Sequence, residues 1–412
     1  MDMWIGWPDI SLHPLKKIYN SKKEHIMKPT ILVLGGGIGG VTAAKALRNE
    51  MGNEDGINLA RILVFEKEKS NLFAPSLTWM MVGKRNEEQI SQKMEGMEFG
   101  GVEIIYGEIE SVDPRTRTVI SGGNSYSGDY MIISIGAEKS EVHNLGLYGH
   151  NFYTTQGASE FYSELKEFKG GKIAITVSSL PHTSPVAPYE AALLIEDYIS
   201  NKGYGEATDI TLYTPETKPM PFAGDEISAS VRELMKEKGI HYKPEYELTG
   251  AEKDTLIFSN SADNTEKEQF DLLAYTPKHE CPKLLRDAGL TGNSEWVDVD
   301  KDTLQTAFDK VYAIGDAVSF KQDGEDTIPK AGVFAQIQAR VVAHNIARIE
   351  SGKKPDKSFE ASGSYILDQG AKASKIDGDF DSENISLTNS GLFRHWEKVL
   401  AEKTWFLKNF HS

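Results

Sequence analysis

A glycine-rich turn near the start of the chain has the residue types and spacing of a dinucleotide-binding loop. Residues 31–40 read ILVLGGGIGG, an apolar run that enters a G-x-G-x-x-G turn at Gly35, Gly37 and Gly40, with Gly39 in the same turn. The first glycine of such a turn allows the tight bend, the second lets the backbone approach a pyrophosphate, and the third lets the next helix pack on the strand. The turn is therefore suited to bind a phosphate-bridged cofactor through its backbone amides.

The segments around this turn are the elements that a dinucleotide loop requires. Residues 30–34 are typical of a buried parallel strand, and residues 41–47 begin a helix whose N-terminal amides attract phosphates. The next strand, residues 61–65, ends at Glu66, which can accept hydrogen bonds from the hydroxyls of an adenosine ribose. G-x-G-x-x-G alone has many false matches, but here strand, loop, helix, strand and acid occur in order. An acid rather than an arginine argues against a 2′-phosphate.

Two later segments point to FAD as the dinucleotide. Residues 129–137 read as a strand that runs into Gly136, where such chains cross to a second domain. Residues 311–314 read as a strand that returns to the first sheet and ends at Gly315 and Asp316. Ligands of open α/β sheets bind at the carboxyl ends of strands, so Asp316 can hold the ribityl hydroxyls of a flavin. The alternative is that this aspartate only caps a helix.

A second strand–helix–strand unit lacks the glycines that the first one carries. Residues 172–177, 187–200 and 209–213 predict strand, helix and strand, and the loop over residues 178–188 contains three prolines and no glycine. A nicotinamide dinucleotide needs backbone amides pressed against its pyrophosphate. This loop therefore argues against NADH as the reductant.

Composition narrows the function classes further. The chain has 412 residues, enough for two or three domains, and 26% of them are charged, with no apolar run long enough to span a bilayer. The net charge of −16 argues against a nucleic-acid partner. Cys281 is the only cysteine, so a disulfide within the chain is impossible, which fits a reducing cytoplasm.

Short motifs along most of the chain resemble one group of flavoproteins with two dinucleotide-binding domains. The motifs are the loop at 35–40, FAPS at 73–76, GKR at 83–85, PVAPYE at 185–190, GDA at 315–317, PKAG at 329–332, GSY at 363–365 and IDGDF at 376–380. Over roughly residues 28–408 the chain resembles sulfide:quinone oxidoreductases and the flavin subunit of flavocytochrome c sulfide dehydrogenases.

This resemblance implies an α/β fold with two Rossmann-like dinucleotide-binding domains, a C-terminal hairpin and an amphipathic helix. We expect residues 30–136 and 300–352 to form a discontinuous FAD-binding domain and residues 137–299 to form the second domain, without the glycine fingerprint. Residues 353–412 would be the quinone- and membrane-proximal region. Residues 1–29 lie outside the pattern and predict a disordered extension.

The resemblance also assigns residues to the flavin. It places Ala74, Pro75 and Ser76 at the cofactor, and because residues 71–76 contain no cysteine, the FAD should be bound noncovalently. Residues 330–332 open a long helix whose N-terminus would stabilise negative charge on the reduced ring. These are Lys330, Ala331 and Gly332, and Lys330 would add to this effect or contact a quinone oxygen, unless it is a solvated lysine. The pattern predicts no metal site.

The chain departs from the resembled family at the residues that carry sulfur chemistry. In that family a pair of cysteines beside the flavin cycles through a disulfide or polysulfide. Ser184 and Tyr365 occupy the two positions here, and neither side chain can form a persulfide. Cys281 is the remaining thiol, although a small buried residue in a loop is the alternative. Glu190 is the candidate general acid or base, with a helix-surface glutamate as its alternative.

Residues 391–410 predict a helix with an apolar face and basic flanks, which suits a membrane interface, with Trp405 at the headgroups. The resembled quinone reductases attach to membranes through C-terminal helices. The resemblance therefore implies a cytoplasmic protein that associates peripherally with the inner face of the cell membrane. The alternative is a helix docked on the protein's own body or on a second subunit of a homo-oligomer.

These observations predict an FAD-dependent oxidoreductase that passes two electrons from a small reduced donor to a quinone. The donor would be sulfide or another sulfur species. One alternative is a type II NADH:quinone dehydrogenase-like enzyme or another NAD(P)H-dependent flavin reductase. The other is a catalytically impaired flavin-binding scaffold that serves a partner.

Overall fold

The computed structural model describes residues 28–410, except 55–56, 96–99, 261–263, 293–294, 323–324, 327 and 383. All but the last two residues of the extension predicted over residues 1–29 lie outside the described part of the chain.

A five-stranded parallel sheet forms the first half of the molecule, in the order β22-β11-β1-β4-β7. Its strands are consecutive runs of buried aliphatic residues, as expected for a parallel sheet covered on both faces. The strands are β1 (Thr30–Leu34), β4 (Arg61–Glu66), β7 (Val102–Tyr106), β11 (Tyr130–Ile133) and β22 (Val311–Ala313). The strand that follows the second domain thus joins the N-terminal sheet.

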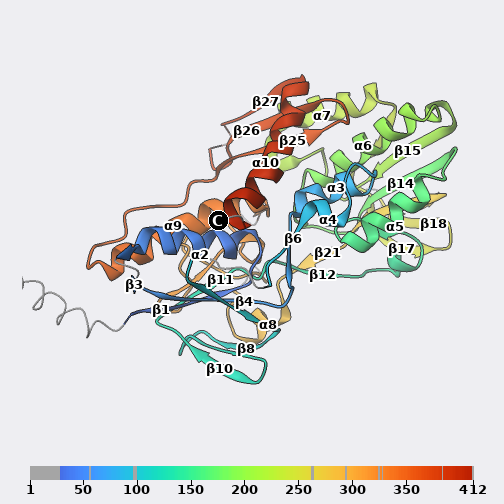
Figure 1. The fold of residues 1–412 in the computed structure, drawn as a ribbon. Coiled ribbons are helices and arrows are strands. Elements are labelled where there is room, and N and C mark those ends of the chain that lie inside the picture. Colours follow the sequence, from blue (N-terminus) through green and yellow to red (C-terminus); the bar gives the residue numbers. More distant parts are fainter. Residues whose placement is uncertain are drawn as a thin grey trace, which may run out of the picture.

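Two helices cover one face of this sheet. Helix α2 (Ile38–Met51) follows the glycine loop, and α9 (Gly332–Glu350) packs alongside it (Figure 1). An antiparallel meander lies on the other side of the sheet (Figure 1); its strands are β8 (Ile109–Asp113), β9 (Thr118–Ser121) and β10 (Asn124–Ser127).

Between β4 and β7 the chain leaves the sheet and forms short elements that reach toward the second domain. They are β5 (Ser70–Leu72), η1 (Ala74–Ser76), α3 (Leu77–Met80), α4 (Glu87–Ile90) and β6 (Ser91–Lys93). Helix α3 packs against α5 and α6 of the second domain, which brings the predicted flavin segment to the boundary between the two sheets.

The second domain has its own parallel sheet, in the order β13-β20-β14-β15-β16. Its strands are β13 (His150–Asn151), β14 (Gly171–Val177), β15 (Thr208–Tyr213), β16 (Ile240–Lys243) and β20 (Leu272–Thr276). Its helices are α5 (Thr155–Leu165), α6 (Ala187–Asn201) and α7 (Asp225–Glu237). A three-stranded antiparallel sheet follows, made of β17 (Glu247–Glu252), β18 (Thr255–Ser259) and β19 (Thr265–Gln269).

The two passages between the sheets run side by side. Strand β12 (Glu138–Ser140) leaves the first sheet and pairs antiparallel with β21 (Lys278–Glu280), on the return from the second. The helix α8 (Lys283–Asp287) then leads back to the first sheet. The predicted fold class, with two Rossmann-like cores, is confirmed.

The C-terminal region is an antiparallel sheet followed by a long helix. The predicted hairpin is extended by a third strand, and the elements are β25 (Ser362–Asp368), β26 (Ala373–Asp379), β27 (Asn384–Gly391) and α10 (Leu392–Phe410). Figure 1 shows α10 running back from this sheet toward the start of α2.

The end of α10 is docked on the glycine-loop region. Trp405, Phe406 and Phe410 are buried in one apolar cluster with residues of α2 and of the segment after β5. Trp405 Nε1 donates to Asn71 Oδ1 at 3.0 Å, and Asn71 Nδ2 donates to the carbonyl of Gly36 at 2.8 Å. The expectation that Trp405 lies at membrane headgroups is therefore wrong, because its indole N–H has a partner inside the protein.

The opposite face of α10 is apolar and exposed. Five large side chains are between 58% and 69% exposed: Leu392, Phe393, Trp396, Leu400 and Leu407. Among the described residues, no helix is both long and apolar enough to cross a membrane.

We expect Phe406→Ala to destabilise the docking of α10 by about 3 kcal/mol, because it empties a buried aromatic site beside Phe73. Leu407→Ala is the matched control: its side chain is 60% exposed and its loss should change stability by less than about 0.5 kcal/mol. Limited trypsin digestion and thermal unfolding measure both. Equal resistance of the two variants to digestion would contradict the docking.

Candidate active site

The glycine loop has a shape that only glycine permits at two positions. Gly35 has φ of +99°, and a Cβ atom on Gly40 would lie 1.8 Å from the carbonyl oxygen of Gly35. A Cβ atom on Gly37 would meet nothing within 4 Å, so this side of the loop is open. Glu66 lies at the loop, where its Oε2 accepts the amide of Gly36 at 2.6 Å.

A small apolar pocket lies beside Glu66. It lies between the loop, α2 and strands β4 and β7, and its lining includes Val41, Ala44, Val64 and Met94. The loop and the acid thus lie at the carboxyl ends of β1 and β4, where open α/β sheets bind ligands, and the pocket extends from them between α2 and the strands β4 and β7.

Asp316 follows β22 on the same edge of the sheet. Its Oδ1 atom is buried and accepts no hydrogen bond within the described part of the chain. Burial raises the pKa of this carboxyl group, while the charges of Lys330 and Lys139 lower it. A buried carboxylate oxygen needs a donor, and the hydroxyls of a ribityl chain supply donors. The residues present therefore fit FAD, which when bound would accept and pass on two electrons.

Lys330 is held against the Asp316 turn and is not a solvated lysine. It is 6% exposed, its Nζ donates to the carbonyl oxygens of Val318 and Asp316, and it lies 3.7 Å from the ring centroid of Trp296. A contact with a quinone oxygen stays a prediction. Ala331 and Gly332 begin α9 next to this lysine.

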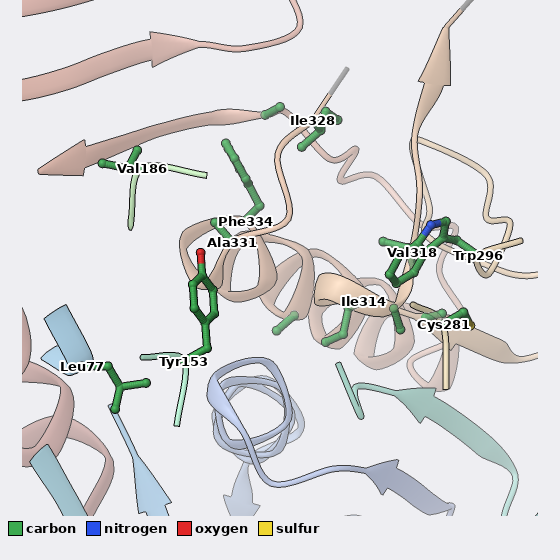
Figure 2. Packing of buried hydrophobic residues seen from close by; sticks show 14 of the residues in the cluster. Leu77, Tyr153, Val186, Cys281, Trp296, Ile314, Val318, Ile328, Ala331 and Phe334 are labelled. Carbon is green, nitrogen blue, oxygen red and sulfur yellow. The ribbon is translucent and has the colours of Figure 1, made fainter. Parts of the chain in front are cut away.

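Ser184 lies beside the start of α9. Its amide donates to the carbonyl oxygen of Lys330 at 2.7 Å, and its φ of +50° is unusual for serine. The hydroxyl of Tyr153 donates to the carbonyl oxygens of Thr183 and Ser184, at 2.9 and 3.3 Å. Figure 2 shows Tyr153 pointing toward the start of α9 from the side of the second domain.

Tyr365, at the second cysteine position of the resembled family, projects from β25. Its ring packs against Phe222, Phe334 and Phe380, with centroids 5.6 to 6.1 Å apart. Its hydroxyl oxygen is buried and has no partner among the described residues. Burial and the charge of Asp316 raise its pKa well above the usual range, so the phenol is neutral.

Cys281 lies in the buried apolar cluster that contains Trp296 and Val318 (Figure 2). Burial raises the pKa of its thiol to about 11, although Arg286 and Lys330 lower it. A thiolate is the reactive form of cysteine, so this environment favours the packing role.

Glu190 is buried in a polar contact between four elements. Its Oε1 accepts hydrogen bonds from Lys398 Nζ of α10 and from Thr78 Oγ1 of α3, and its Oε2 accepts the amide of Asp368 at 3.2 Å. Burial raises the pKa of Glu190, Lys398 lowers it and Asp368 raises it. A surface glutamate is therefore excluded, because Glu190 is 3% exposed.

Asp368, which is fully buried, extends this contact toward the surface. Its Oδ2 accepts Trp79 Nε1 at 2.9 Å and lies 2.8 Å from His395 Nδ1, and its Oδ1 accepts the amide of Gly370 at 2.8 Å. Sequence reasoning missed Asp368 and His395, because neither belongs to a motif.

Glu402 of α10 ties the helix to the predicted flavin segment. It is fully buried, accepts Ser76 Oγ at 2.7 Å, and lies 3.1 Å from Arg85 Nε. Lys398 belongs to the basic flanks that the sequence predicts for an interfacial helix, but it is 6% exposed and so lies inside the protein. Lys398 and Glu402 are both buried because each has a partner of opposite charge.

The acid that follows the second strand of the second fold is drawn into internal contacts. Glu216, after β15, is 4% exposed and accepts hydrogen bonds from Tyr189 and, at 3.1 Å, from Thr214 Oγ1. The amide of Ser178 is also used internally, on Thr276 Oγ1 at 3.3 Å. Within the described residues no group of three or more metal-ligating side chains could hold a metal ion.

Curated relatives match the chain over most of its length. It is 24% identical over 408 residues to the sulfide-quinone reductase of Aquifex aeolicus, covering 93% of this chain and 92% of the relative. It is also 24% identical over 374 residues to the type II NADH:quinone oxidoreductase of Haemophilus influenzae, covering 80% and 82%.

Solved structures agree on the fold. The sulfide:quinone oxidoreductase of Aquifex aeolicus superposes with a TM-score of 0.82 at 23% identity, covering 93% of this chain and 91% of that one. Residues 29–339 match the family described as pyridine nucleotide-disulphide oxidoreductase. The chain belongs to this family, as an FAD-dependent oxidoreductase that is similar to sulfide:quinone reductases.

Proposed function

We propose that the protein passes two electrons from a small reduced donor, sulfide or another sulfur species, through noncovalently bound FAD to a quinone. The main support for this proposal is that polar groups of the second domain, which an NAD(P)H site would need, already form hydrogen bonds within the protein. Tyr189 and Thr214 both donate to Oε2 of Glu216, and the amides of Ser178 and Ser184 donate to internal acceptors. An NAD(P)H site would need these groups for a ribose and a pyrophosphate.

The donor side differs from the cysteine-based cycle of the resembled family. The hydroxyls of Ser184 and Tyr365 cannot be oxidised to a disulfide, and Cys281 is buried away as a neutral thiol. Electrons would therefore pass from the donor to the flavin without a protein-bound sulfur intermediate. Glu190 is the group that we assign to proton transfer near the acceptor, because it is buried beside the predicted flavin segment and paired with Lys398.

The type II NADH:quinone oxidoreductase among the relatives makes NADH the competing donor. We expect an anaerobic titration with sulfide to bleach the visible flavin absorbance of the purified protein, while NADH leaves it unchanged. The same titration with sulfite and with a thiol tests two further donors. Stoichiometric bleaching by NADH but not by sulfide would make NADH the donor and would contradict the proposal. A flavin that no donor reduces would favour a flavin-binding scaffold without turnover.

Two glycine variants separate cofactor binding from folding. Gly37→Ala should leave the fold intact, because the added Cβ meets nothing, but should weaken FAD binding at least tenfold, since a pyrophosphate approaches this position. Gly40→Ala should destabilise the protein itself, because its Cβ would clash with the carbonyl oxygen of Gly35. FAD fluorescence quenching and thermal unfolding of the apoprotein measure the two effects. Undiminished FAD binding in both variants would contradict the cofactor site.

We also propose that the exposed face of α10 associates with the inner face of the cell membrane. Five large apolar side chains lie on this face, with Arg394, Lys403 and Lys408 on the same helix to meet anionic headgroups. The docked inner face of the helix would stay on the protein during this association.

Vesicle binding tests the membrane proposal. Trp396→Ser combined with Leu400→Ser should reduce co-sedimentation with vesicles of anionic phospholipid at least tenfold, because it removes apolar area from the interface. Leu147→Ser, at a leucine that is 74% exposed in the second domain, is the matched control and should bind like the unchanged protein. Equal binding by all three proteins would place the membrane contact elsewhere.

A further inference from the structure

The C-terminal helix α10 is joined to the glycine loop by two consecutive hydrogen bonds. Trp405 Nε1 donates to Asn71 Oδ1 at 3.0 Å, and Asn71 Nδ2 donates to the carbonyl oxygen of Gly36 at 2.8 Å. Asn71 is 4% exposed and Trp405 is 5% exposed, so both bonds lie away from solvent. We call this chain of Trp405, Asn71 and the Gly36 carbonyl group the indole relay.

The indole relay fixes the orientation of one peptide group in the glycine loop. The amide of Gly36 donates to Glu66 Oε2 at 2.6 Å, and its carbonyl oxygen accepts from Asn71. The peptide bond between Gly36 and Gly37 is trans, so this carbonyl group and the next N–H group point in opposite directions. Because Asn71 holds the carbonyl group toward the protein interior, the N–H group of Gly37 points outward. This residue is the one at which a dinucleotide pyrophosphate approaches the backbone.

Helix α10 also contacts other parts of the predicted cofactor site. At its last turn, Lys45 Nζ of α2 donates to the carbonyl oxygen of Lys408 at 2.5 Å, which attaches α10 to the helix that follows the glycine loop. Before Trp405 in the chain, Glu402 accepts Ser76 Oγ at 2.7 Å, in the segment predicted to border the flavin. The helix therefore contacts the segments predicted to hold both ends of the cofactor, and displacing it would disturb both.

We propose that Asn71 and Trp405 are positioning residues for the cofactor, and that FAD binding and the docking of α10 strengthen each other through the indole relay. This role rests on the noncovalent FAD of the proposed function. An amide that is already turned outward needs no rearrangement when a pyrophosphate binds, so the docked helix raises the affinity for FAD.

The same coupling acts in the other direction. A pyrophosphate that accepts from the Gly37 amide fixes the peptide group whose carbonyl oxygen Asn71 holds, so bound FAD stabilises the docked helix. Coupling between two binding events is reciprocal, and each therefore favours the other by the same factor. Loss of FAD and release of the C-terminal helix accompany each other as a consequence.

The first test compares two tryptophans of the same helix. Trp405→Phe removes the indole N–H and keeps an aromatic ring, and it should weaken FAD binding about tenfold, because the buried Asn71 acceptor loses its donor. Trp396→Phe is the matched control, because the same exchange at a side chain that is 58% exposed should leave the affinity unchanged. Titration of each apoprotein with FAD, followed by fluorescence quenching, gives the dissociation constants. Equal affinities of the two variants would overturn the proposal.

A double-mutant cycle separates positioning from a general loss of stability. Asn71→Ala should by itself weaken FAD binding about tenfold, because it releases the carbonyl group of Gly36. In that background Trp405→Phe should not change the FAD affinity further, since the indole acts through Asn71. A purely structural contribution of Trp405 would lower the affinity by the same factor in both backgrounds, and that result would overturn the proposal.

The reverse effect is measured by NMR on the unchanged protein, with tryptophan isotopically labelled. The indole N–H signals of Trp405 and Trp396 are identified by their absence in the two phenylalanine variants. Bound FAD should slow the deuterium exchange of the Trp405 indole about tenfold relative to the apoprotein and leave that of the exposed Trp396 unchanged. An equal exchange rate of the Trp405 indole with and without FAD would contradict the coupling.

Failure of the indole relay and failure of the cofactor site give different results. If Gly37→Ala loses FAD while Trp405→Phe binds it as tightly as the unchanged protein, the cofactor site stands and the relay is wrong. If the unchanged protein binds no FAD, the cofactor site itself is wrong, and the relay with it.

Discussion

Three carboxylates that are almost fully buried decide how the C-terminal helix meets the rest of the molecule. Glu190, Asp368 and Glu402 are between 0% and 3% exposed, and an unpaired charge at such depth would cost several kcal/mol. Each has its partner on another segment: Lys398 for Glu190, His395 for Asp368, and Arg85 for Glu402. Because all three pairs involve α10, the helix can leave its place only by exposing or unpairing them together.

Because the three ion pairs hold α10 in place, its two faces make different contacts. Its inner face carries the ion pairs between residues 395 and 402 and then the aromatic contacts of Trp405, Phe406 and Phe410, so it touches elements of both predicted nucleotide folds. Its outer face keeps large apolar side chains in solvent. A helix fixed so firmly from within can offer an apolar face outward without collapsing onto its own protein, which is what a peripheral membrane contact requires.

The fold class and the family could be predicted because their signals are local. Strand β1, the glycine turn and α2 are consecutive, and the loop of the second fold is recognisable by its three prolines. The faces of α10 could not be predicted, because helical periodicity places charged residues in solvent. Lys398 and Glu402 are buried by partners 208 and 317 residues away in the chain, and the sequence pattern carries no sign of such pairing.

The residues that surround Ser184 and Tyr365 explain what these side chains do at the two positions where the resembled family carries cysteines. Ser184 keeps the backbone contact to Lys330, and Tyr365 fills its position with a ring packed among three phenylalanines. A cysteine at position 365 would leave a void in this aromatic cluster, so the packing here is that of a tyrosine. Within the part of the chain that the structure describes, the hydroxyl of Tyr365 and Oδ1 of Asp316 have no hydrogen-bond partner, and both lie at the same predicted flavin site. A donor that reduces the flavin directly needs such polar contacts for orientation, whereas a persulfide relay needs a thiolate that this chain does not place there.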